Sequence, residues 1–155
     1  MRLALENCAT DSLTFFGLRD CKVDDESFAG MLGALMVHSR LNILDLDDTA
    51  LDINTYKKLA LFLRWSFTEL SYLYLNNTTI DDQGLDLDVL IIALAGKSKL
   101  QTVDLSRNSP ITPIGLRAFS TLLKSPNCNL ETLNIYSSNV HVESIIAFAS
   151  ALANN

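Results

Sequence analysis

Cysteine, tryptophan and histidine are scarce in this sequence, and long apolar runs are missing. The 155 residues include three cysteines, one tryptophan and two histidines. An odd number of cysteines argues against a disulfide framework, so we expect a reducing, cytoplasmic compartment. The longest apolar stretch, Val89 to Ala95, is far shorter than the ~18 residues that a membrane-spanning helix needs, so no membrane partner is predicted.

Basic residues are also outnumbered. Twelve lysines and arginines stand against eighteen aspartates and glutamates, and the net charge is −6 at pH 7. An acidic surface repels phosphate groups, which argues against nucleic acid as a partner. It favours a basic protein partner mildly, but solubility alone also explains an acidic surface, so the sequence leaves that choice open.

One pattern recurs along the whole chain. Five segments carry apolar residues at their first, fourth, sixth and about their eleventh positions, and a Cys, Thr, Asn or Ser at the ninth. They begin at Leu13, Leu41, Leu70, Leu100 and Leu130, with spacings of 28, 29, 30 and 30 residues. The fourth and sixth positions alternate with polar ones, as in a strand. The ninth position falls where the chain turns, and a side chain there can bind backbone groups. Its residues are Cys21, Thr49, Thr78, Asn108 and Ser138.

A helical segment is predicted behind each strand. Helix starts are indicated by Asp24 or Asp25, by Asp52, by Asp81 or Asp82, and by Thr112 followed by Pro113. Apolar residues then recur at helical spacing in three stripes: Phe28, Met31, Leu32 and Leu35; Leu87, Leu90, Ile91 and Leu94; and Ile145, Phe148, Ala149 and Leu152. A single unit cannot bury its leucines, but stacked units can. We therefore expect a parallel sheet that lines the inside of an arc, with helices outside.

The stretch NSPITPIGLRAFSTLLKSPNCNLETLNI, from Asn108 to Ile135, resembles the ribonuclease-inhibitor-like class of leucine-rich repeats. The resemblance extends from Leu13 to Asn155. It implies an α/β leucine-rich-repeat solenoid, which is a right-handed βα superhelix with a concave parallel sheet and convex helices. It says little about function, because members of this class bind many unrelated partners.

We expect residues 1–155 to form a single domain. Residues 1–12 do not make a further full unit, and they are interpreted either as the end of a preceding repeat or as a short capping strand from Arg2 to Asn7. No polar cap follows Asn155, although solenoids need caps at both ends. The chain is therefore expected to be a fragment of a longer solenoid, or a small protein that forms a homodimer through its uncapped ends.

The predicted binding surface lies on the concave wall, where the third, fifth and seventh positions of each repeat face away from the leucines. A solvated strand face is normally polar, but Phe15, Ile43, Tyr72 and Tyr74 fall on it and are predicted to form one patch. Aromatic residues inside a polar rim are typical of binding hot spots, although cross-strand pairing that only stabilises the sheet explains them nearly as well. The predicted partner-binding residues are Phe15, Arg19, Ile43, Asp45, Asp47, Tyr72, Tyr74, Asn76, Asp104 and Tyr136.

An acidic group lies beside this patch: Asp45, Asp47, Asp48 and Asp104. Two explanations are equally favoured. Either a basic partner offsets the repulsion among these carboxylates, or Arg19 and Arg107 neutralise it within the sheet. A calcium or magnesium site is disfavoured, because the spacing matches no metal loop and DDQGLDLD from Asp81 lacks the glutamate of an EF-hand.

Signals for catalysis are weak. His38 is expected at a helix end and His141 near the start of the last helix, so they belong to distant units. Neither has a cysteine or serine at a spacing that indicates a nucleophile pair. Cys21 is expected to be buried and inert, and Trp65 to be packed at the end of an apolar helix. No enzyme activity, cofactor or metal is therefore predicted.

We predict a protein-interaction module that binds a protein or peptide on its concave face. Two alternatives remain open. One is regulation of an enzyme, as an inhibitor or a GTPase activator, with Arg19 or Arg107 as contacts; it rests on the family resemblance. The other is a structural repeat segment of a larger receptor.

Overall fold

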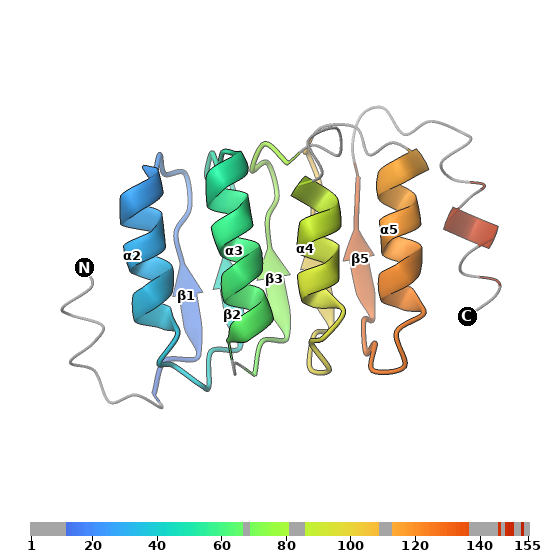
Figure 1. Ribbon diagram of the computed structural model, residues 1–155, viewed down its shortest axis with the longest axis horizontal. Coiled ribbons are helices and arrows are strands. Elements are labelled where there is room, and N and C mark those ends of the chain that lie inside the picture. Colours follow the sequence, from blue (N-terminus) through green and yellow to red (C-terminus); the bar gives the residue numbers. More distant parts are fainter. Residues whose placement is uncertain are drawn as a thin grey trace.

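The computed structural model describes residues 12–66, 69–80, 86–108 and 113–136, together with residues 146, 148–150 and 153. Strands and helices alternate along these ranges, as the repeat predicts. The elements are β1 (Phe15–Gly17), α2 (Asp25–Leu35), β2 (Ile43–Asp45), α3 (Ile53–Trp65), β3 (Tyr72–Tyr74), α4 (Asp86–Leu94), β4 (Thr102–Asp104), α5 (Pro113–Leu123) and β5 (Thr132–Asn134). Figure 1 shows the four helices side by side in one layer, with the strands in a second layer behind them.

The strands form one parallel sheet in the order β1-β2-β3-β4-β5. Each strand pairs with the next at equivalent positions of the repeat, so that Phe16, Leu44, Leu73, Val103 and Leu133 lie in one row across the sheet. Backbone hydrogen bonds continue beyond the strands, for example from the N–H of Leu46 to the carbonyl of Tyr74 at 2.9 Å. This in-register pairing confirms the predicted repeat register.

The core lies between the sheet and the helix layer. Leu44, Leu73 and Val103 are 0% exposed, as the fourth position of the repeat predicts. They belong to the same buried apolar cluster as Leu59 on α3 and Leu90 on α4. Each helix packs against the helix of the next unit. The described interior is therefore continuous along the stack, as expected when a unit cannot bury its apolar face alone.

Two aspartates fix where α2 and α3 begin. Asp24 accepts a hydrogen bond from the N–H of Ser27 at 2.8 Å, and Asp52 accepts one from the N–H of Thr55 at 2.9 Å. These bonds favour the charged carboxylates and lower the pKa of both aspartates. The N-caps predicted at Asp24 and Asp52 are confirmed, and α5 begins at the predicted Pro113. The starts proposed at Asp81, Asp82 and Thr112 lie outside the described residues.

The ninth position of the repeat binds the backbone of the turn. Asn108 Nδ2 donates to the carbonyl oxygens of Leu75 at 2.7 Å and Leu105 at 2.9 Å, and Asn108 Oδ1 accepts the N–H of Thr78 at 2.9 Å. The Tyr56 hydroxyl donates to the carbonyl of Thr78 at 2.7 Å from helix α3. The prediction that this position satisfies backbone groups is confirmed for Cys21, Thr49, Thr78 and Asn108, whose side chains all bond backbone carbonyls. Ser138 lies outside the described residues.

Two predicted environments differ from those observed, while His38 lies at the expected helix end. Cys21 is half-buried rather than buried, and its Sγ donates to the carbonyl of Arg19 at 3.1 Å. Trp65 is 61% exposed, because it stands on the outer side of the last turn of α3. His38 follows α2 with its ring fully buried, and neither ring nitrogen has a hydrogen-bond partner among the described residues. His38 thus packs in the interior just beyond the end of α2.

Candidate protein-interaction surface

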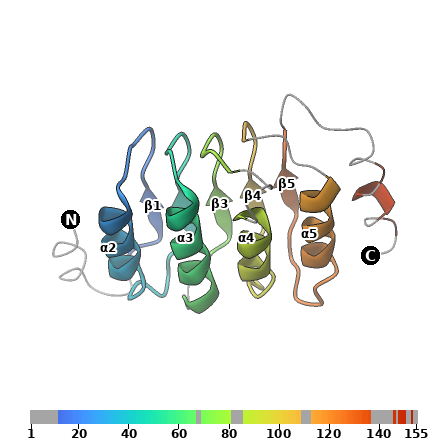
Figure 2. The same cartoon turned by 45° about the horizontal axis from the view of Figure 1, so that its top comes forward.

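One face of the sheet carries no helix in the described part of the chain. Figure 2, turned from the first view, again shows α2, α3, α4 and α5 on a single side of the strands. Because side chains alternate along a strand, the residues flanking the buried row point to the opposite side. We call this side the open face; its strand residues are Phe15, Gly17, Ile43, Asp45, Tyr72, Tyr74, Thr102, Asp104, Thr132 and Asn134.

Three of the predicted apolar residues are direct neighbours on the open face. Phe15 pairs with Ile43, and Ile43 pairs with Tyr72. Phe15 is 52% exposed, while Ile43 and Tyr72 are half-buried. Tyr74 lies two residues beyond Tyr72 on the same strand and is also half-buried. The structure therefore brings together the four residues that the sequence assigned to one patch.

Gly17 makes room for the Phe15 ring. A Cβ atom added at Gly17 would lie 2.9 Å from Phe15 Cζ and 3.2 Å from Phe15 Cε1. The ring therefore lies along β1, over the residue that has no side chain. The Phe15 ring therefore extends the apolar surface along β1, toward the end of that strand.

Arg19 and Asp45 are already paired with each other. Arg19 Nε donates to Asp45 Oδ2 at 2.6 Å, and the Nη2 of the same guanidinium contacts that oxygen too. Asp45 is only 3% exposed, and its Oδ1 accepts the N–H of Asp47 at 3.2 Å. The interaction with Asp45 raises the pKa of Arg19. Of the two explanations for the acidic group, internal neutralisation is therefore observed for Arg19.

Asp47, which follows β2, is less closely paired with Arg19 than Asp45 is. Its Oδ1 accepts the N–H of Asn76 at 2.8 Å, and its Oδ2 lies 3.7 Å from Arg19 Nη2. Burial raises the pKa of Asp47 despite the bond from Asn76, and the nearby charges of Asp45 and Asp104 act in the same direction. A cation from a partner would relieve this strain on the charged carboxylate.

Asp104 shapes the exit of β4. Its Oδ1 accepts the N–H of Ser106 at 2.8 Å and the Ser106 hydroxyl at 2.5 Å, and its Oδ2 accepts Asn134 Nδ2 at 3.0 Å. Asn76 Nδ2 donates to the same Ser106 hydroxyl. Carboxylates that bind an N–H two residues ahead hold the chain in an Asx turn. Asp45 and Asp104 therefore have a structural role that the sequence did not reveal.

Arg107 and Tyr136 lie away from the apolar row. Arg107 is exposed and forms no ion pair with any described residue, so the neutralising role considered for it is not observed. Tyr136 follows β5 and is 72% exposed, and its carbonyl accepts the N–H of Arg107 at 2.7 Å. Strand β4 lies between β5 and the strand that carries Tyr72 and Tyr74, so Tyr136 is not a direct neighbour of the patch.

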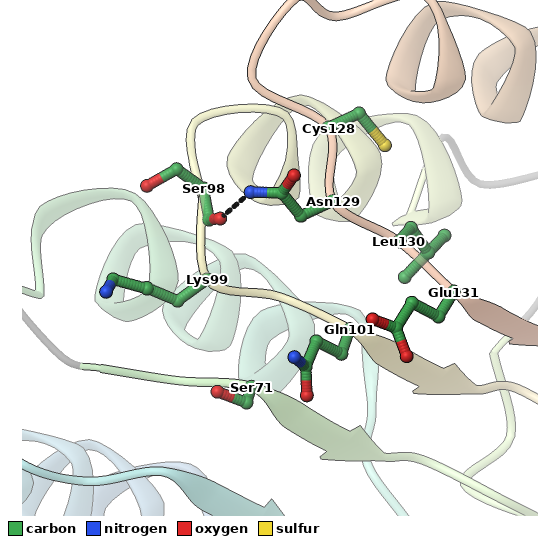
Figure 3. A pocket seen from close by; sticks show the side chains of 8 residues that line it. All are labelled: Ser71, Ser98, Lys99, Gln101, Cys128, Asn129, Leu130 and Glu131. Atoms are coloured by element: carbon green, nitrogen blue, oxygen red, sulfur yellow. Dashed lines mark hydrogen bonds between the residues drawn. The ribbon is translucent and has the colours of Figure 1, made fainter.

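A polar hollow lies at the opposite ends of the strands. It has a volume of about 550 Å³ and is lined by Ser71, Ser98, Lys99, Gln101, Cys128, Asn129, Leu130 and Glu131 (Figure 3). Asn129 Nδ2 donates to the Ser98 carbonyl across it. The free thiol of Cys128 has no histidine beside it among the described residues that line the hollow. No three metal-ligating side chains of the described residues come together to hold an ion.

The alternation of parallel strands and helices defines an α/β repeat fold. The family model described as leucine rich repeat matches residues 96–120, which include β4 and much of α5. This match and the five-stranded parallel sheet support a leucine-rich repeat protein. Such repeats generally mediate protein–protein interaction and are typically non-catalytic. No curated protein matches the chain. None of the described helices is both long and apolar enough to cross a membrane.

Proposed function

We propose that the chain is a non-catalytic interaction module that binds a protein or peptide on its open face. We take this face to be the concave wall of a right-handed superhelix of the ribonuclease-inhibitor-like class. The observation that carries the proposal is the continuous apolar row formed by Phe15, Ile43 and Tyr72, with Tyr74 beside it. Apolar side chains on a strand face that none of the described helices covers are available to a partner.

The patch has the composition of a binding hot spot. Phe15, Tyr72 and Tyr74 supply large apolar area, and the two tyrosines add hydroxyls that can bond across an interface. Asp47 and Asn76 lie at the strand exits and form a polar rim. We assign Phe15, Ile43, Tyr72 and Tyr74 to direct contact, and Arg19, Asp45 and Asp104 to holding the rim in shape.

A partner with basic side chains near its apolar contact fits this surface best. Among the described residues, Arg19 is the only cation that forms an ion pair with the acidic group. That group contains four carboxylates, those of Asp45, Asp47, Asp48 and Asp104, so negative charge is in excess here. Regulation of an enzyme through Arg19 is less well supported, because its guanidinium is already bound by Asp45.

A pull-down with matched variants tests the proposal. Wild type and a Tyr72→Ala/Tyr74→Ala double variant are compared with a Val37→Ser variant, which changes an exposed apolar residue just after α2. We expect one partner to be retained by wild type and Val37→Ser and lost from the double variant. Equal retention by all three proteins would place binding elsewhere and contradict the proposal.

A further inference from the structure

A second apolar surface lies on the helix side, between α3 and α4. It is a groove of about 220 Å³ lined by Ala60, Leu61, Arg64, Val89, Ile92 and Ala93. The two helices are neighbours in the helix layer (Figure 1). We propose that this α3–α4 groove binds an amphipathic helix of a partner protein, with acidic residues along the flank that faces α3.

The groove exposes apolar side chains where a surface helix is normally polar. Leu61 is 55% exposed and Ile92 is 64% exposed, and Val89 is 39% exposed on the same wall as Ile92. Trp65, one helical turn beyond Leu61, is 61% exposed at the end of α3. A cluster of this kind, in contrast to scattered single residues, marks an interaction site.

The floor of the groove is made by small residues. Ala60 and Ala93 are each 4% exposed, so their methyl groups close the bottom of a channel whose walls are Leu61 and Ile92. A channel between two parallel helices accepts the ridge of a third helix. Helix α3 has 13 residues, which at ~1.5 Å per residue gives a length of roughly 20 Å. A partner helix can therefore place two or three apolar anchors at helical spacing.

The cations on α3 indicate that the bound helix is acidic. Helix α3 contains no acidic residue, and its exposed cations Lys57 and Arg64 form no ion pair with any described residue. Lys58, by contrast, is bound to Asp25 on α2. Arg64 lies over the ring of Trp65, with Cζ 5.4 Å from the ring centroid, which holds the guanidinium beside the apolar wall. Two unpaired cations next to apolar residues are complementary to an acidic amphipathic helix.

A charged residue on the α4 side of the groove determines how the bound helix is oriented. Asp88 is half-buried on α4, one helical turn before Ile92. It disfavours acidic side chains on that side, so the carboxylates of the bound helix belong over α3. A second copy of this chain is the competing occupant. It is disfavoured because α3 of a second copy contains no acidic residue that could pair with Lys57 and Arg64.

The only tryptophan of the chain provides a direct readout. The full-length protein is titrated with a synthetic helical peptide that has leucines along one face and glutamates along one flank, and with the same peptide carrying lysines instead. We expect the acidic peptide to shift the Trp65 emission to shorter wavelength and to bind at least about tenfold more tightly than the lysine peptide. The variant Ile92→Glu is expected to lose binding, and Arg64→Glu to prefer the lysine peptide. Both positions are exposed, and far-ultraviolet circular dichroism confirms that the variants fold.

The Tyr74→Ala variant is the matched control, because it changes only the open face and is expected to bind the acidic peptide as wild type does. The proposal is overturned by equal binding of the two peptides, by no saturable shift, or by unchanged binding to Ile92→Glu. It is also overturned if sedimentation shows a dimer of the full chain that Ile92→Glu dissociates, because a second copy then fills the groove. None of these outcomes affects binding on the open face, so the two proposals fail independently.

Discussion

Arg19 and Asp45 form an ion pair across β1 and β2, although the arginine side chain is 61% exposed and the aspartate side chain only 4%. The contact joins the segment that follows β1 to the last residue of β2. It also gives the buried Asp45 carboxylate a positively charged partner beside the apolar row. The pair therefore acts on the shape of the open face and leaves the arginine little freedom to bind a partner.

Removing the arginine should cost more stability than removing both members of the pair. Arg19→Ala leaves the buried Asp45 carboxylate with only the N–H of Asp47 as a described partner, and an uncompensated buried charge is costly. We expect a lower melting temperature for Arg19→Ala, and partial recovery in Arg19→Ala/Asp45→Asn. A double-mutant cycle by calorimetry measures the coupling, and additive effects of the two changes would contradict it.

Stability should depend on pH through Asp47. Its raised pKa means that the folded state holds the proton more tightly than the unfolded state does. The resulting stabilisation is complete below the ordinary pKa of aspartate, near 3.9, and is lost as pH rises through the folded-state pKa. Asp47→Asn should therefore be more stable than wild type at pH 7, with the difference disappearing below about pH 4. Denaturation at several pH values checks this, and a difference that does not change with pH would refute it.

Asn108 should be essential to the turn between repeats. It is only 9% exposed, and its side chain bonds the carbonyls of Leu75 and Leu105 and the N–H groups of Thr78 and Ile80. Asn108→Ala removes the hydrogen-bond partner of these buried backbone groups. Each group that water does not reach then lowers the free energy of unfolding by about 1–3 kcal/mol. We expect a loss of at least about 3 kcal/mol in the free energy of unfolding, measured with urea. The exposed Asn129 is the control, and its change to alanine should cost less than about 1 kcal/mol.

Replacing Arg107 should stabilise the protein. The eighth position of four repeats has a positive φ, with values of 51° at Asp20, 57° at Asp48, 52° at Asn77 and 56° at Arg107. Asp and Asn tolerate this left-handed region better than arginine does, because their short side chains bond locally. Arg107→Asn should therefore raise the free energy of unfolding by about 0.5–1 kcal/mol. Arg107→Ala keeps the Cβ and should bring no such gain; equal effects of the two changes would show that backbone strain is not the cause.

The sheet register could be predicted because the leucine spacing is periodic over five units. A shift by one residue would expose Leu44 and Leu73, so the buried row was fixed by the apolar pattern alone. The same pattern placed Phe15, Ile43 and Tyr72 side by side, because equivalent positions of parallel strands pair. Helix starts at Asp24 and Asp52 followed from local capping chemistry.

The pairing of charges could not be read from the sequence. Arg19 and Arg107 occupy similar places in the repeat, but only Arg19 forms an ion pair with the acidic group among the described residues. Arg19 follows β1, which neighbours the strand that carries Asp45, whereas Arg107 follows β4. The bonds that Asp45 and Asp104 accept from N–H groups two residues ahead were missed, although an aspartate at a strand exit is a recognisable signal for them. The α3–α4 groove does not follow from the inward-facing apolar stripes of the helices, because its walls are the exposed residues Leu61 and Ile92. The apolar run before Trp65 favours an interior position, but the residue is exposed.

Titration calorimetry with the partner recovered by the pull-down tests the central claim most directly. Wild type and Tyr74→Ala are compared, and the melting temperature of each protein is measured alongside. Binding on the open face predicts that Tyr74→Ala weakens affinity at least about tenfold while the melting temperature stays nearly unchanged. Full affinity in a folded Tyr74→Ala protein would contradict the account.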